Sequence, residues 1–405
     1  MLGEKGMIKF TLVLLFCSSI SVQAITYSDA LEKIQEHEVI QSGNFKVRAI
    51  QEEAKSKGSW GDPVFKIAAK NYPIDTLAND QTPMTGIDFG VSQKIPLTNK
   101  YEVKKSALES LSQAYRYNIE NQKELLILNF WNILIENRKL SDELIILENN
   151  KDWIEKNLKV SSRLYTMGKV TQQAILEIQI RSFELDNIIS NKKHELSKIK
   201  EKIKYLTGHS EIEEKSIPWN SLDTSSTDNI DYRELEFQEK VKAKQHAITA
   251  SSLDLISDIT ISLNYTQRSN IDMVGDFIGV SISFPLPFSD KKSSNYSKSL
   301  YEESKTLKEY EVYKKSKNRD IMLKTQEIKK LNSELNVLNN KIIGFAIDAR
   351  KIISKSYGVG KATYIELLQS ELNLQNILLR KVALESKRDL ERVSLKYIKG
   401  DLFDE

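Results

Sequence analysis

The side chains that most often bind metal ions or carry out catalysis are sparse in this chain of 405 residues. One segment groups a histidine with three glutamates, namely His209, Glu211, Glu213 and Glu214. Such side chains can bind a metal ion, but this spacing matches no established ligand pattern, and a solvated acidic linker is the simpler interpretation. The remaining histidines are far apart, and no nucleophile motif or phosphate-binding loop is present. We therefore expect a protein that is not an enzyme and that has no cofactor and no bound metal.

The N-terminus has the features of a secretory signal. Two lysines precede a short apolar run over residues 10–16, and Val22 and Ala24 occupy the two key positions of a cleavage site. We expect residues 1–24 to be a signal peptide and the mature chain to begin at Ile25. A single membrane anchor is the alternative, but the apolar run is too short to span a bilayer.

The only cysteine, Cys17, lies inside this signal, so we expect a mature chain with no disulfide and no thiolate site. A lipoprotein start at Cys17 is a competing interpretation. Bulky Phe16 disfavours it, because a small residue is expected immediately before the lipidated cysteine.

Composition narrows the class of protein further. With 40% hydrophobic and 28% charged residues, the chain is too polar for a helical membrane protein and too apolar to be disordered. The net charge is +3 and opposite charges are interspersed, so no basic surface indicates nucleic acid. No later stretch approaches the roughly eighteen apolar residues of a membrane helix. Any membrane span must therefore be built from strands.

Long segments without proline predict very long helices, because proline breaks helix interiors. None occurs between Leu97 and Ile217 or after Phe288. Apolar residues recur every seven positions in the first of these spans: Leu126, Ile133, Leu140, Leu147 and Ile154. This spacing is typical of helices packed as coiled coils.

We expect a helix over Asn99–Met167, roughly 100 Å long at about 1.5 Å per residue, followed by a turn at Gly168 and a returning helix that ends near Thr207. The second half repeats this plan, with a helix over Ser294–Ser356, a turn at Gly358–Gly360 and a returning helix over Thr363–Tyr397.

Alternation of apolar and polar residues predicts four strands. It is clear at Thr85–Ile95, Asp258–Thr266 and Ile278–Phe288, and weaker at Val64–Asn71. A soluble antiparallel sheet with one dry face would show the same pattern. Four strands are too few to close a barrel, and an open edge cannot face lipid. If the strands span a membrane, two or three protomers must therefore share one barrel.

Two short matches indicate an internal duplication. Gly90-Val91-Ser92 with Ile95-Pro96-Leu97 matches Gly279-Val280-Ser281 with Phe284-Pro285-Leu286 at an offset of 189. Around the helix turns, Tyr165, Gly168, Lys169, Thr171 and Leu176 match Tyr357, Gly360, Lys361, Thr363 and Leu368 at an offset of 192. Two separate motifs at nearly one offset favour a repeat over coincidence.

The predicted segments, in order, are a signal peptide (1–24), an N-terminal helical segment (25–60), a first β-hairpin (61–97), a first long helical hairpin (98–208), a linker (209–230), a helix of the second repeat (231–256), a second β-hairpin (257–288), a second long helical hairpin (289–398) and a C-terminal tail (399–405).

With this order of elements the chain resembles the TolC family of outer-membrane efflux proteins over essentially its whole mature length. The resemblance rests on the doubled strand and helix plan and on the two turn segments, residues 163–170 and 356–363. Within the family it resembles the CzcC-like branch, which serves heavy-metal efflux, through residues 61–63, 71–75 and 83–96. Thr98-Asn99-Lys100 departs from that branch, which often has Pro-Gly-Lys there.

The resemblance implies an α+β membrane protein of the Gram-negative outer membrane whose helices extend into the periplasm. It implies a homotrimer in which four strands per protomer contribute to a shared twelve-stranded transmembrane β-barrel, while the coiled-coil hairpins form an α-barrel. The implied partners are a periplasmic adaptor (a membrane fusion protein), an inner-membrane pump of the RND type and outer-membrane lipid, with no nucleic acid. The implied function is that of a passive exit duct for small solutes or heavy-metal cations in a tripartite efflux system.

The two turns are the candidate docking sites for the adaptor, through Arg163, Tyr165, Gly168, Lys169, Tyr357, Gly358, Gly360 and Lys361. Glycine permits backbone conformations that other residues resist, and an exposed lysine offers a charge to a partner. The alternative is that these residues only reverse the chain.

The resemblance also aligns Glu366 and Gln369 with a pair of aspartates at the periplasmic constriction of some members, and Glu177 is the first-half equivalent of Gln369. Three copies of Glu366 would form a ring of carboxylates able to filter cations. A solvated helix face is the competing interpretation of these three residues.

Two other functions fit parts of the sequence. The outer-membrane channel of a type I protein or peptide secretion system would have the same architecture. A periplasmic coiled-coil adaptor or structural protein would explain the helices and the signal, but not the four alternating strands.

Overall fold

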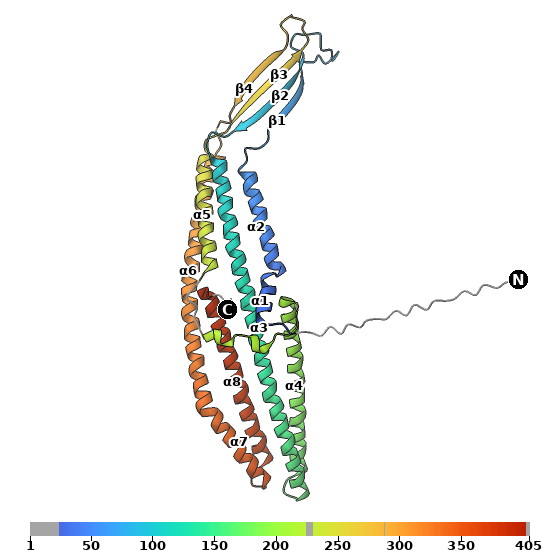
Figure 1. The fold of residues 1–405 in the computed structure, drawn as a ribbon, viewed down its shortest axis with the longest axis vertical. Coiled ribbons are helices and arrows are strands. Elements are labelled where there is room, and N and C mark those ends of the chain that lie inside the picture. The colour runs from blue at the N-terminus through green and yellow to red at the C-terminus, as the bar shows by residue number, and fades with distance from the viewer. Residues whose placement is uncertain (1–23, 224–229, 287, 402–405) are drawn as a thin grey trace, which may run out of the picture.

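The computed structural model describes residues 24–223, 230–286 and 288–401. The predicted signal peptide, apart from Ala24, lies outside the described residues, as do the last four residues of the predicted C-terminal tail. The molecule is a long rod with a β-sheet at one end and two helix turns at the other (Figure 1).

The elements follow the predicted doubled order. The first half contains α1 (Tyr27–Gln35), α2 (Glu38–Lys57), β1 (Val64–Lys70), β2 (Gly86–Ile95), α3 (Lys100–Thr166) and α4 (Gln172–Thr207). Two short 3₁₀ helices, Glu214–Ser216 and Trp219–Asp223, lie in the linker. The second half contains α5 (Tyr232–Leu253), β3 (Ile259–Arg268), β4 (Phe277–Ser283), α6 (Lys291–Val337), α7 (Ile343–Gly358) and α8 (Tyr364–Lys399). The expectation of long helical hairpins with four strands per chain is therefore confirmed.

Two details differ from the sequence expectation. The helix expected over Ser294–Ser356 is not a uniform α-helix, because a π-helical turn over Leu338–Ile342 separates α6 from α7. Such a turn changes the helix face that meets its neighbours. The last strand ends at Ser283 rather than Phe288. Pro285 follows it, and a proline has no N–H to continue a strand ladder.

The four strands form one antiparallel sheet in the order β1-β2-β3-β4. Its register aligns Phe65, Val91, Leu263 and Val280 in a single row across the sheet. The neighbouring row, on the opposite face, contains Lys66, Gly90, Asn264 and Gly279. One face of the sheet is therefore apolar and the other is polar and glycine-rich.

The apolar face of the sheet is not covered by any described helix. The side chains of its central row are 62%, 48%, 56% and 69% exposed. The sheet extends beyond the ends of the helices instead of packing on them (Figure 1). A soluble sheet normally buries such a face, so this exposed apolar surface requires another solvent or partner.

The helices form two tiers joined at the middle of the rod. In the tier beside the sheet, α5 packs against α3 and α6. In the tier beside the turns, α8 occupies the same place between α3 and α6. The two tiers meet where the N–H of Ile230 donates to the carbonyl of Gly400 at 2.9 Å. Buried Phe130 and Trp131 form the centre of the hydrophobic core at this level.

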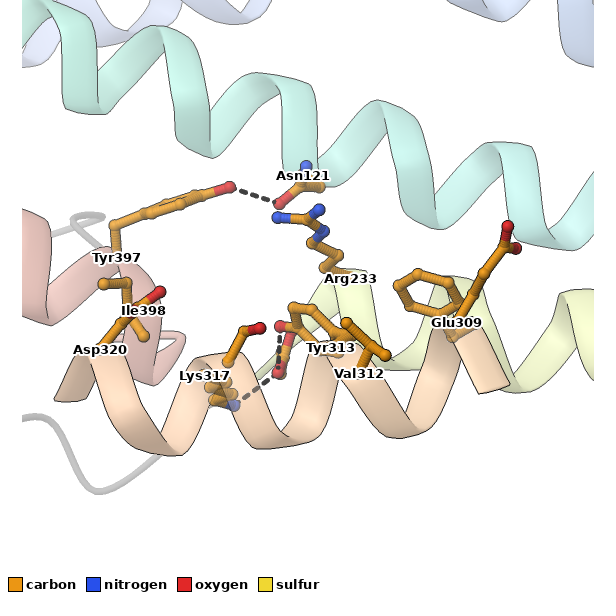
Figure 2. Close-up of a pocket in the computed structure, with 12 residues that line it drawn as sticks. Asn121, Arg233, Glu309, Val312, Tyr313, Lys317, Asp320, Tyr397 and Ile398 are labelled. Atoms are coloured by element: carbon orange, nitrogen blue, oxygen red, sulfur yellow. Dashed lines mark hydrogen bonds and ion pairs between the residues drawn. The ribbon is translucent and has the colours of Figure 1, made fainter. Parts of the chain in front are cut away.

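Figure 2 shows the cavity of about 240 Å³ at this junction. On one side, Asp231 caps α5 and accepts hydrogen bonds from Tyr313 (2.8 Å) and Lys317 (2.5 Å) of α6. On the other side, the hydroxyl of Tyr397 in α8 donates to Asn121 of α3 at 2.9 Å. Burial and the carboxylate of Asp231 strongly raise the pKa of Tyr313, which therefore remains a protonated donor. These bonds hold the two tiers in register.

Candidate docking and gating site at the helix turns

The turn between α3 and α4 is built by a short local motif. Gly168 has a positive φ of 71°, which places it in the left-handed region that glycine tolerates best. Its N–H bonds to the carbonyl of Tyr165 at 2.9 Å, and the N–H of Lys169 bonds to the carbonyl of Leu164 at 2.9 Å. This pair of bonds is the Schellman motif that ends many helices. Thr171 then caps α4 by accepting the N–H of Ala174.

The turn between α7 and α8 repeats this motif at the matching residues. Gly360 has a φ of 76°, its N–H bonds to the carbonyl of Tyr357 at 2.9 Å, and the N–H of Lys361 bonds to the carbonyl of Ser356 at 2.8 Å. Thr363 caps α8. The repeated Gly and Thr positions are thus explained by backbone geometry and capping, whereas the tyrosines contribute only backbone carbonyls to the turns. The lysines contribute only their backbone N–H groups to the turns.

The two turns lie together at the end of the rod opposite the sheet (Figure 1). The side chain of Lys169 lies beside the second turn, because a Cβ added to Gly360 would be 3.4 Å from its Cδ. Arg163, Lys169, Gly358 and Lys361 are exposed, and Tyr165 is 45% exposed. The predicted docking residues of both hairpins therefore form one surface, with Tyr357 as the exception.

Tyr357 is fully buried, so its side chain offers no surface to a partner, contrary to the sequence expectation. It packs in the tip core with Leu164, Ile178 and Leu367. Its hydroxyl lies 2.6 Å from the hydroxyl of Ser161 in α3. Since Ser161 donates to the carbonyl of Asn157 at 2.9 Å, Tyr357 is the donor to Ser161. Tyr357 therefore ties the second hairpin to the first.

The three residues predicted to form a gate are not joined to one another. Glu366 is exposed and completes a capping box, accepting the Thr363 N–H at 2.7 Å and its hydroxyl at 3.0 Å. These hydrogen bonds lower the pKa of Glu366. Gln369 is exposed and Glu177 is half-buried. Within the described protomer no hydrogen bond or ion pair links Glu177, Glu366 and Gln369.

A buried polar network near the turns was not expected from the sequence. Glu371 of α8 is fully buried and pairs with Arg181 of α4, whose Nε lies 3.3 Å from the carboxylate. Arg181 also donates to Gln375 at 2.7 Å, and the side-chain amide of Asn150 in α3 donates to the same Gln375 oxygen at 3.2 Å. Arg350 of α7 donates to Asn150 at 3.3 Å. Four helices from both hairpins thus share one network.

The charges of this network carry a desolvation cost. Burial raises the pKa of Glu371, although Arg181 opposes that shift. Burial likewise lowers the pKa of Arg350, which lies over the ring of Trp153 at 5.3 Å. Buried ion pairs add little net stability, but removing one partner is costly. The network therefore favours one specific arrangement of the two hairpins.

A signal for this network exists in the heptad pattern. The buried face of α4 contains Ala174, Ile178, Arg181, Leu185 and Ile189. The buried face of α8 contains Leu367, Glu371 and Leu374. In each helix a charged residue occupies a position with core spacing, and the two charges are opposite. That combination indicates from the sequence that each charge lies on a buried face, but not which residue it pairs with.

The described residues contain no cluster of histidine, cysteine, aspartate or glutamate arranged to hold a metal ion. His209 instead interacts with Thr207 through its backbone N–H and its ring. Among the described helices, none is long and apolar enough to cross a membrane.

Neither protein-family models nor the sequences of curated proteins match the chain. Solved structures do. CusC, whose structures were described in relation to transmembrane channel formation, aligns with a TM-score of 0.76 at 11% identity, covering 94% of this chain and 93% of that one. The outer membrane protein VceC of Vibrio cholerae aligns with a TM-score of 0.74 at 15% identity, covering 92% and 96%. The outer membrane channel CmeC of Campylobacter jejuni aligns with a TM-score of 0.73 at 12% identity, covering 92% and 85%. At these identities the similarity establishes the architecture: the chain has the fold of outer-membrane channel proteins.

Proposed function

We propose that this protein is the outer-membrane channel of a tripartite efflux system. It would be a passive duct through which small solutes or heavy-metal cations leave the cell, with the energy supplied by an inner-membrane pump. The observation that carries the proposal is the exposed apolar face of the sheet. Lipid is the environment that such a face fits, and the sheet lies at the opposite end of the rod from the turns (Figure 1).

The edges of the sheet support an oligomer. Within the described protomer, β1 pairs only with β2, and β4 pairs only with β3. Unpaired backbone groups are costly in lipid, so each edge requires a strand from a neighbour. An edge that pairs with a different edge gives a head-to-tail interface, which forms a ring when the rotation between protomers closes. We propose a ring of three protomers, as the family resemblance implies.

The helices near the turns carry matching apolar stripes on opposite edges. Leu176, Ile180 and Phe183 of α4 are 50%, 54% and 70% exposed. On α7, Phe345 and Ile352 are 76% and 63% exposed. In this tier the packing order is α4, α3, α8, α7, so the two stripes face outward on opposite sides. Packing one stripe against the other between protomers would bury both.

The function is tested by membrane fractionation of expressing cells and by conductance of the purified protein in lipid bilayers. We expect recovery in the outer membrane and stable ion-conducting channels. A protein recovered in the soluble periplasm would favour a coiled-coil adaptor or structural protein and contradict the proposal.

The ring is tested with paired cysteines, since the only cysteine, Cys17, lies in the predicted signal peptide. Phe183→Cys combined with Ile352→Cys should give disulfide-linked dimers and trimers on non-reducing gels, whereas Ile352→Cys alone should remain monomeric. Absence of linked species in the double variant would contradict this interface.

The docking surface is proposed to bind a periplasmic adaptor through Lys169 and Lys361, with Arg163 and Tyr165 beside them. A photo-crosslinker at position 169 or 361 should capture the adaptor. The same group at Lys308 should not, because that lysine is also solvent-exposed but lies on α6, far from the turns. Capture from Lys308 alone would place docking elsewhere.

The gate is proposed to include Glu366, Gln369 and Glu177. Single-channel recording of Glu366→Ala should show altered cation selectivity or altered block by divalent ions. The Glu366→Gln variant distinguishes charge from capping, because Gln can still accept the Thr363 N–H. Unchanged recordings in both variants would leave Glu366 with its capping role only.

A type I secretion channel is the alternative transport function, and the structural similarities do not separate it from efflux. Loss of metal or drug tolerance upon deletion, with normal protein secretion, would favour the efflux function.

A further inference from the structure

We propose that Lys66 gives the exit passage of this channel a preference for anionic solutes. The inference rests on the proposed function, in particular on the apolar face of the sheet meeting lipid. Under that condition the opposite, polar face of the sheet lines the passage.

All charged residues of the four described strands lie on that polar face. The register places Lys66 and Lys70 of β1, Asp88 and Lys94 of β2, and Arg268 of β3 on the same side. The apolar face, which alternates with it, has no charged residue in these strands. The lining thus contains four cationic side chains and one anionic side chain per protomer.

Most of these charges are already compensated within the protomer. Lys70 pairs with Asp88, which also accepts a hydrogen bond from Thr266. Lys94 lies 2.9 Å from Asp258, just before β3. Arg268 pairs with Asp272 in the loop between β3 and β4.

Lys66 is the exception within the described protomer. It is exposed, and no hydrogen bond or ion pair joins it to a described residue. Its row across the sheet consists of Gly90, Asn264 and Gly279, so no acidic side chain and no bulky one lies across from it. Gly279 opens onto empty space. The positive charge of the Lys66 ammonium group is therefore uncompensated and acts on the ions and solutes in the passage.

The position of this charge decides its effect. In a closed ring, three copies of Lys66 would lie at one level within the membrane-spanning strands. Rings of charged side chains set the charge selectivity of pores. By Coulomb's law, one unit charge about 7 Å away in water changes the local concentration of a monovalent ion about threefold. The walls of a membrane passage screen less than bulk water, whereas dissolved salt screens more, so this figure is an order of magnitude.

Acidic side chains elsewhere do not cancel this charge at its own level. Asp272 and Asp276 belong to the loop beyond β3, where Asp276 accepts the N–H of Arg268 and the hydroxyl of Tyr265. Asp258 lies at the other end of the strands, where Lys94 and Lys100 contact it. The middle of the passage is therefore the place where the positive charge is uncompensated.

The test is the reversal potential of single channels in bilayers under a potassium chloride gradient. In a Glu366→Gln background, which removes the carboxylate ring proposed for the gate, the channel should pass chloride in preference to potassium. Lys66→Gln should lower the chloride-to-potassium permeability ratio about threefold, and Lys66→Glu should reverse the preference. Lys66→Arg retains the charge and should retain the preference.

A variant that adds charge tests the role of Lys66 without relying on a loss of selectivity, which misfolding could also cause. Val64 lies on the same face, two residues before Lys66, and is 60% exposed. Val64→Lys should add a second ring of charge and raise the chloride preference.

The outcomes separate this inference from the proposed function. In the Glu366→Gln background, channels that conduct but prefer potassium, or whose preference is unchanged by Lys66→Gln and Val64→Lys, would overturn the inference and leave the channel function intact. A protein that forms no channel at all would overturn both.

Discussion

The two helix turns have the same backbone structure and different surroundings. Both end a long helix with a glycine of positive φ and begin the next helix with a threonine cap. Tyr165 in the first turn is 45% exposed, whereas its counterpart Tyr357 is fully buried. The hydroxyl of Tyr357 donates a hydrogen bond to Ser161. The second-half equivalent of Ser161 is Ile353, which has no hydroxyl to accept a bond. The repeated sequence therefore encodes the turns, while the packing between hairpins decides what each side chain does.

This difference assigns separate tasks to the two turns. The first turn presents its tyrosine at the surface, where a partner can contact it. The second turn uses its tyrosine to hold α7 against α3. Together with the Arg181–Glu371 pair, this contact makes the second hairpin dependent on the first. Substitutions at matching positions should therefore have unequal effects wherever packing is involved, and equal effects wherever only the turn is involved.

The largest difference in stability loss between matching positions is expected for the two tyrosines. Tyr357→Ala should lower the free energy of unfolding by about 3–5 kcal/mol, because it removes a fully buried aromatic side chain. Tyr165→Ala should change it by less than about 0.5 kcal/mol, because that side chain is largely in solvent. Chemical unfolding of the two purified variants measures both values. Similar losses at the two positions would contradict the division of tasks.

Tyr357→Phe refines this comparison. It keeps the ring and removes only the hydrogen bond to Ser161, whose hydroxyl still donates to Asn157. We expect a loss of about 1 kcal/mol. A loss as large as that of Tyr357→Ala would mean that the hydroxyl, rather than ring packing, holds the hairpins together.

The next largest effect is expected at Glu371. Glu371→Ala should cost about 3 kcal/mol, because it leaves the buried Arg181 without its main partner. The matching position of the first hairpin is Gln179, which is half-buried and forms no hydrogen bond with the described residues of the network. Gln179→Ala should therefore cost less than about 1 kcal/mol. Equal costs would show that the network is not specific to the contact between hairpins.

The pH dependence of stability tests the same carboxylate. Burial raises the pKa of Glu371, so the folded protein binds this proton more tightly than the unfolded chain does. Its contribution is fully present below the unfolded pKa and is lost as pH rises through the folded pKa. Glu371→Gln does not titrate. The stability of the native protein relative to this variant should therefore fall as pH rises from about 4 to 7, and a rising difference would contradict the assigned direction.

The glycines are expected to behave alike. Gly168→Ala and Gly360→Ala each force an L-residue into the left-handed region, at a cost of about 1–2 kcal/mol. A Cβ at Gly168 would meet no atom within 4 Å, and one at Gly360 would be in ordinary contact with Lys169. Thermal unfolding of both variants should therefore give similar shifts. A much larger effect at Gly360 would reveal a tighter contact between the turns than the distance of 3.4 Å implies.

The turns and the long helices could be predicted because their determinants are local. Proline-free spans with apolar residues every seven positions predict long helices. A glycine followed by a threonine three residues later predicts how one helix ends and the next begins. The exposure of Tyr165 and the burial of Tyr357 depend on which helix packs beside each residue. That information is not contained in either turn.

The buried network and the uncovered sheet illustrate the same limit. Glu371 has core spacing, but whether a charge at that position is solvated or paired depends on Arg181, 190 residues away. Alternation in β2 and β3 predicts a sheet with one apolar face, and a soluble sheet has that pattern too. In the structure no described helix covers that face, and the alternation alone does not predict this exposure.

The smallest difference in stability loss between matching positions is expected for the two threonine caps. Thr363 accepts the N–H of Glu366, and Glu366 in turn accepts the N–H of Thr363, which completes a capping box. Thr171 makes only the first kind of bond, at 3.4 Å, because position 174 is an alanine. Thr363→Ala should therefore cost about 1 kcal/mol and Thr171→Ala about 0.5 kcal/mol.

Because hydrogen bonds from Thr363 lower the pKa of Glu366, the capping contribution is present above the unfolded pKa of this carboxyl and is lost as pH falls through its folded value. The difference between the two variants, measured by thermal unfolding, should accordingly shrink in acid. A difference that persists at low pH would assign the extra stability at the second turn to Thr363 alone, independent of the Glu366 charge.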